Sequence, residues 1–241
     1  MKRLRLIPIA FVVAALLATG FVPTSAPNLT AKAQSVGDPA DAMLADAAEK
    51  MLGYDTMKFD LIYEKGSTKL YTGIKMTKAS GEIQRPGKMK ATVQTKVGFV
   101  KVNVKATVIG DKAEVRAVGI NEDYTLPSDL AHIIADPVLL LPDMVGALKD
   151  PVITKVETVK KGREKGKELT WISGTFDPTL IQDEAVRGYA ESLGERPVEV
   201  AIDENGLIVS VRIPGAFVSQ DSKDVVRRLD IYGFGEPVDI S

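Results

Sequence analysis

Cysteine is absent from this chain of 241 residues, and histidine occurs only once, as His132. The lack of cysteine excludes disulfide bonds, thiolate metal sites, cysteine nucleophiles and lipid attachment through an amino-terminal cysteine. A single histidine excludes a metal site with several histidine ligands. No histidine lies at a catalytic motif spacing from Ser128 or Ser173, which excludes a serine hydrolase. We therefore predict that the protein is not an enzyme and holds no metal or cofactor.

The chain also lacks an excess of either positive or negative residues. The chain has 31 basic and 32 acidic residues, which gives a formal net charge of -1. Because the sequence shows no basic stripe and no glycine-rich phosphate loop, we expect no nucleic-acid partner. With 45% hydrophobic and 26% charged residues, the composition is that of an ordinary globular protein of one or two domains.

The amino-terminal stretch has the pattern of a secretory signal peptide. A basic start precedes an apolar run from Ile9 to Leu17, and Ala31-Lys32-Ala33 fits the small-x-small cleavage pattern. We predict a cleaved signal peptide at residues 1–33 and one mature domain at residues 34–241, located outside the cytoplasm. The alternative is a retained membrane anchor, although the apolar run is slightly short for a spanning helix.

Aromatic residues are few, at 6% of the chain, and the most regular stretch uses almost none. Between residues 100 and 108, apolar and polar residues alternate strictly, which is typical of a strand with one buried side. The pattern recurs at 89–97 and 113–117, with Gly98 and Gly110-Asp111 at the breaks, and predicts an antiparallel meander. The apolar side of its middle strand consists of small residues: Val100, Val102, Val104, Ala106 and Val108.

Helical stretches interrupt the predicted strands at three places. Asp38-Pro39 caps the first helix, which ends at Gly53, and Asp177-Pro178 caps the last. Between them, residues 121–151 form an apolar insertion that prolines break into short helices. The remaining segments are strands in hairpin order, so we predict an α+β fold with one large antiparallel sheet that curls.

The small residues on the apolar side of the sheet leave volume that something else must fill. If the helices lie inside the curl, the result is an ordinary dry core. If they lie over its mouth, a cavity suited to an apolar ligand remains. Sequence patterns alone do not decide between these two arrangements.

A series of short stretches, in order along nearly all of the mature chain, matches a known family. They are Gly81-Glu82-Ile83-Gln84-Arg85-Pro86-Gly87-Lys88, Val108 to Lys112, Asp136-Pro137 with Leu139 to Leu141, Ser173 to Asp177, Pro197 to Val200 with Ile202-Asp203, and the closing strand to Pro237-Val238. In these stretches the chain resembles the LppX/LprG-type family of mycobacterial envelope lipoproteins, within the wider LolA/LolB-like group. No single motif is catalytic, so the resemblance rests on order and coverage.

The predicted strands number about ten to eleven, and the resemblance implies that they form a LolA-like half-barrel around several short helices. It also implies a hydrophobic cavity that binds acylated lipids or glycolipids and carries them in the cell envelope. A membrane surface or an envelope transport protein would then be a further partner. Family members carry a cysteine after the signal for lipid attachment, whereas this chain has none.

We predict that the ligand-binding residues come from the meander, the insertion and the first helix. Each of them could instead be an ordinary core residue. The predicted set is Val93, Val102, Val104, Ala106 and Val115 from the sheet, Ile133, Ile134, Leu140, Met144 and Leu148 from the insertion, and Leu44 and Met51 from the first helix.

A second hypothesis is a protein-docking or envelope-sensing module of the same group that carries no lipid. An exposed apolar patch on the helical insertion would be its expected surface.

Overall fold

One antiparallel sheet of twelve strands organises the structure. The computed structural model describes residues 38–71, 74–97, 99–118, 120–126, 135–182, 187, 194–216 and 221–240. The strands are β1 (Thr56–Lys65), β2 (Thr68–Tyr71), β3 (Ile74–Gln84), β4 (Lys88–Val97), β5 (Val100–Ile109), β6 (Lys112–Ala117), β7 (Ile120–Thr125), β8 (Leu148–Thr158), β9 (Glu168–Phe176), β10 (Arg196–Asp203), β11 (Ile208–Pro214) and β12 (Val226–Tyr232). The helical segments are α2 (Pro39–Leu52), η1 (Pro137–Leu140), α4 (Leu141–Gly146) and η2 (Pro178–Leu180).

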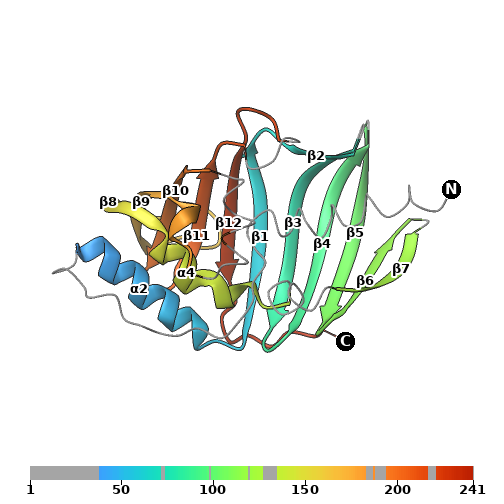
Figure 1. Cartoon of the computed structure of the whole chain (residues 1–241), viewed down its shortest axis with the longest axis horizontal. Helices are drawn as coiled ribbons and strands as arrows, with labels where there is room; N and C mark the ends of the chain where they lie inside the picture. The colour runs from blue at the N-terminus through green and yellow to red at the C-terminus, as the bar shows by residue number, and fades with distance from the viewer. Residues whose placement is uncertain are drawn as a thin grey trace.

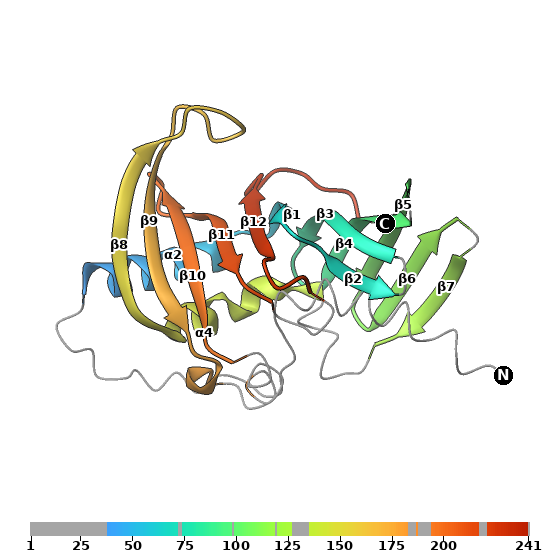
Figure 2. The same ribbon diagram turned by 90° about the horizontal axis from the view of Figure 1, so that it is seen from above.

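The sheet is open, with β7 at one edge and β8 at the other. Its order is β7-β6-β5-β4-β3-β1-β12-β11-β10-β9-β8, and β2 pairs with β3 beside this path. Two runs of neighbouring strands, β1–β7 and β8–β12, therefore meet where β1 pairs with β12. Figure 1 shows α2 and α4 on one face of the sheet, which we call the inner face, and Figure 2 shows how the sheet bends.

The sheet has more strands than the ten to eleven expected from the sequence. The apolar insertion predicted at residues 121–151 is shorter than expected, because β7 occupies 120–125 and β8 begins at Leu148. An edge strand pairs on one side only and tolerates polar residues, which is why the polar stretch of β7 forms a strand.

The first helix forms as its caps predict. The side chain of Asp38 accepts a hydrogen bond from the amide of Ala40 at 3.0 Å, Pro39 is the first helical residue, and Gly53 closes the last turn. The buried residues of α2 follow one stripe of the helix and consist of Ala40, Leu44, Ala47, Ala48 and Met51.

The last predicted helix is described only at its start. The carboxylate of Asp177 accepts hydrogen bonds from the amide and hydroxyl of Thr179, at 2.9 and 2.7 Å, and so caps η2. Residues 183–186 and 188–193, which the sequence also assigns to this helix, lie outside the described residues.

The central meander forms as the antiparallel hairpins that the sequence predicts. Val93 pairs with Val104 across β4 and β5, and Ala106 pairs with Val115 across β5 and β6. The tight turn after β5 contains Gly110 at φ +59°, a conformation that favours glycine. Val100 departs from the predicted pattern, because it lies on the apolar side of β5 but is 63% exposed.

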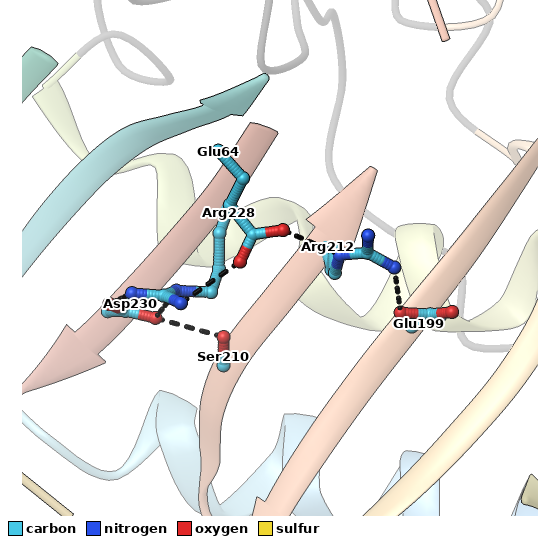
Figure 3. A network of polar contacts seen from close by, with 6 residues as sticks. All are labelled: Glu64, Glu199, Ser210, Arg212, Arg228 and Asp230. Atoms are coloured by element: carbon cyan, nitrogen blue, oxygen red, sulfur yellow. Dashed lines mark hydrogen bonds and ion pairs between the residues drawn. The ribbon is translucent and has the colours of Figure 1, made fainter. Parts of the chain in front are cut away.

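The opposite, outer face of the sheet is polar. Arg212 of β11 contacts both Glu64 and Glu199, at 2.7 and 2.8 Å, and Arg228 of β12 contacts Glu64 and Asp230. Figure 3 shows that these side chains link neighbouring strands across the junction of the two runs, with the helices behind the sheet. Positive and negative groups alternate in this network, so each charge has a partner.

Candidate functional site

The inner side of β5 changes gradually from a buried to an exposed surface. At one end, Val108 and Ala106 are each 1% exposed. Further along the same side, Val104 and Val102 are half-buried, and Val100 is mostly in contact with water. All five side chains are apolar, so the strand carries its apolar surface beyond the region that the core covers. We call the end at Val100 the open end and the end at Val108 the closed end.

A side chain of the neighbouring strand β1 fills part of the volume above the small residues of the meander. A Cβ atom at Gly81 of β3 would lie 2.6 Å from the ring of Phe59, and 2.5 Å from the carbonyl oxygen of Lys90. Gly81 pairs with Phe59, so the ring lies over the position where a side chain is missing. The low aromatic content therefore does not leave the whole inner face empty, because Phe59 occupies this part.

The predicted ligand-binding residues fall into three groups of packed side chains. Leu44, Met51, Leu140 and Leu148 belong to the largest core cluster, and Met144 packs against it. The sheet residues belong to two smaller clusters: Val93 lies with Leu61, Met76 and Ala79, whereas Ala106 and Val115 lie together, and the half-buried Val104 packs against both. The residues predicted from the first helix and the insertion thus lie in a different cluster from those predicted from the meander.

Three residues of the predicted ligand-binding set remain, namely Val102, Ile133 and Ile134. Val102 is half-buried on the inner side of β5 and belongs to none of these clusters of the described residues. Ile133 and Ile134 lie outside the described residues. Whether any of the set touches a ligand stays a prediction.

The meander residues that join the helices in the largest cluster were not in the predicted set. They lie at the closed end of the meander, and they alternate in sequence in the same way as the residues that were chosen. Alternation identifies the buried side of a strand but not the position along it that a helix covers. The residues concerned are Ile83, Met89, Ala91, Val108 and Ala113.

A buried ion pair joins the helices to the closed end. Arg85, just after β3, contacts Asp136 with Nε 2.7 Å from Oδ2, and its Nη1 donates a hydrogen bond to the carbonyl oxygen of Leu52 at the end of α2. The Asp136 side chain is 4% exposed. Burial raises the pKa of this carboxyl, and the hydrogen bond and positive charge of Arg85 act in the opposite direction. Both residues belong to the stretches that carried the family resemblance.

A second buried ion pair lies on the inner face, beside Thr68 of β2. Arg227 of β12 pairs with Asp221, and the hydroxyl of Thr68 donates a hydrogen bond to Asp221 at 2.6 Å. Arg227 also donates a hydrogen bond to Thr68, at 3.1 Å, and lies over the ring of Tyr63. The inner face therefore contains polar as well as apolar groups.

Among the described residues we find neither a metal-binding cluster nor a helix that could span a membrane. Among them, no three His, Cys, Asp or Glu side chains gather closely enough to hold a metal ion. His132 lies outside this part of the chain. No helix among the described residues is long and apolar enough to cross a bilayer.

Comparison with known proteins places the chain in a family. A model of the LppX_LprAFG lipoprotein family matches residues 38–240. The crystal structure of LprF from Mycobacterium bovis is similar at a TM-score of 0.55 with 16% sequence identity, covering 84% of this chain and 95% of that one. The Mycobacterium tuberculosis lipoprotein LppX is similar at a TM-score of 0.53 with 16% identity, covering 85% and 100%. No curated protein matches the sequence. The chain belongs to the LppX_LprAFG lipoprotein family.

Proposed function

We propose that the protein binds acylated lipids or glycolipids against the inner face of its sheet and carries them outside the cytoplasm. The observation that carries this proposal is the change in burial along β5, where Val104, Val102 and Val100 present apolar surface that the core does not cover. An alkyl chain lying along these valines would remove that surface from water, at about 25 cal/mol for each Å² buried. Family membership and the signal-like start of the sequence support the same proposal.

The first test asks whether the protein carries lipid. Protein purified from its own host should release acylated lipid on extraction with organic solvent, and the delipidated protein should take up an apolar fluorescent probe. A saturable complex with another envelope protein, with no co-purified lipid and no probe uptake, would favour the docking module instead.

The second test locates the binding surface. Val104→Trp fills the space next to two small clusters of the sheet, so it should reduce probe uptake at least tenfold. The matched control is Val156→Trp, because Val156 is 54% exposed on the edge strand β8. Equal uptake by both variants, with unfolding transitions like that of the unmodified protein, would show that the inner side of β5 is not the binding surface.

A further inference from the structure

The open end is formed by the tips of two neighbouring hairpins, β2–β3 and β4–β5. Ile74 pairs with Val97, and Val97 pairs with Val100, so the β2–β3 and β4–β5 tips are neighbours. In Figure 1 these strand ends lie together at the top of the molecule. Phe99, in the turn between β4 and β5, is 100% exposed. A phenyl ring held wholly in water contributes no apolar burial to the fold.

Four lysines lie beside these tips in one row across the sheet, which we call the lysine row. Lys69 of β2 pairs with Lys75 of β3, Lys75 pairs with Lys96 of β4, and Lys96 pairs with Lys101 of β5. Residues paired directly across strands point to the same face, so the four side chains lie together on the outer face. All four are exposed, and within the described part of the chain none of their side chains forms an ion pair or a hydrogen bond.

Such a row is costly for the fold, because like charges directly opposite one another on a sheet repel. Another row on the same face avoids this cost. Lys58 pairs with Glu82, and Glu82 pairs with Lys90, so the signs alternate there. In the network of Figure 3, Arg212 pairs directly with Arg228, but Glu64 contacts both guanidinium groups. The lysine row differs from both, because none of its side chains contacts a carboxylate of the described residues.

The row belongs to a local excess of positive charge. Residues 65–110 contain ten basic residues and a single acidic one, Glu82, although the whole chain has a net charge of -1. The sequence-based expectation of no basic stripe relied on the overall charge, and the structure corrects it. The excess lies in β2 to β5, the strands whose tips carry Phe99 and Val100.

We propose that the tips with Phe99 and Val100, together with the lysine row, form a docking surface for membranes that contain anionic lipids. Apolar side chains at the boundary of headgroups and acyl chains, flanked by lysines that attract anionic headgroups, are how proteins bind a bilayer surface without crossing it. A soluble polyanion would contact the lysines but would leave Phe99 in water. The proposal goes beyond lipid carriage, because docking requires no cargo.

Docking in this orientation has a geometric consequence for the proposed carrier. The apolar inner side of β5 becomes exposed toward Val100, which lies at the same tips. A docked protein would hold the open end of this face against the bilayer. If the proposed function holds, a lipid tail could pass between the membrane and the valines with little exposure to water.

The experiment measures binding of the full chain, in the form its host makes, to sedimented vesicles. The two vesicle compositions are phosphatidylcholine alone and phosphatidylcholine with phosphatidylglycerol. We expect binding to the anionic vesicles that falls steeply with added salt. Lys75→Glu combined with Lys96→Glu should weaken it at least about tenfold, because each basic residue near an anionic surface changes affinity about fivefold.

The matched control reverses two charges in a loop that lies away from the ends of β4 and β5 that form the tips (Figure 2). Lys160 and Lys161 are exposed in the β8–β9 hairpin loop, so Lys160→Glu with Lys161→Glu makes the same change in net charge. We expect this control to bind anionic vesicles within about twofold of the unmodified protein. Equal losses in both double variants, or no loss in either, would overturn the proposal. Vesicle binding and probe uptake are separate measurements. Failure of the docking proposal would therefore not decide whether the protein binds lipid.

A fluorescence probe tests insertion of the tip directly. Phe99→Trp should shift its emission to shorter wavelength on anionic vesicles, because the indole would leave water. Val156→Trp, on the edge strand β8, should show no such shift. Vesicle binding that depends on the lysine row but leaves the tryptophan at position 99 in water would overturn the insertion and indicate a general polyanion site.

Discussion

The two ends of the inner side of β5 have the same sequence pattern but different surroundings. At the closed end, Val108 belongs to the cluster that contains α2 and η1 residues and against which α4 packs, and the pair of Arg85 and Asp136 fixes the helices to the sheet. At the open end, Val100 is exposed beside Phe99 and the lysine row. An alternating strand therefore has an apolar side along its whole length, while distant segments decide how much of it is buried.

The largest effect is expected from breaking the closed end. Asp136→Ala leaves the guanidinium of Arg85 largely buried without its charge partner, so the free energy of unfolding should fall by about 3 to 5 kcal/mol. Urea unfolding followed by circular dichroism measures this loss. Glu236→Ala is the control, because it removes the exposed partner of Lys58 and should cost about 0.5 kcal/mol. Similar losses in the two variants would contradict a special role for the buried pair.

A smaller effect should separate the two ends of one strand. Val108→Ala removes buried methyl groups at the closed end and should lower the free energy of unfolding by about 2 kcal/mol. Val102→Ala, at a half-buried position of the same side, should cost only about 0.5 kcal/mol. The same urea titration measures both, and equal costs would mean that the ends do not differ in packing.

The smallest effect concerns acid stability of the helix-covered region. Hydrogen bonds from Lys149 and Thr179 lower the pKa of Asp177 to about 2. Because this folded value lies below the ordinary value of about 3.9, the carboxylate stabilises the fold above pH 4 and loses this effect as the pH falls toward 2. Asp177→Asn should therefore lower the thermal midpoint at pH 7, and the difference should shrink below pH 4. A difference that stays constant between pH 7 and pH 2 would contradict this.

Local features of the fold could be predicted from the sequence. The cap at Asp38-Pro39 and the turn at Gly110-Asp111 depend on neighbouring residues only, and both form as expected. The family resemblance also identified the fold class correctly. The strand count was too low, because pairing with β6 rather than composition makes β7 a strand.

The candidate site was less predictable because it depends on contacts between distant residues. Nothing local to Arg85 indicates that it pairs with Asp136, 51 positions later in the chain. Likewise, Phe59 fills the space above Gly81 only because β1 lies next to β3. The lysine row needs the register of four strands, since the sequence shows its members only as separate lysines.

The seam between β1 and β12 has a consequence for how the molecule is assembled. Lys58 pairs with Tyr232, so the strand that joins the two runs comes from near the far end of the chain. Until β12 forms, β1 and β11 each present unpaired amide and carbonyl groups along one side. Contacts between such distant positions are slow to form, because a long loop must close first. Before this strand pairs, no strand links the two runs, and each run has an open edge able to associate with other extended polypeptides.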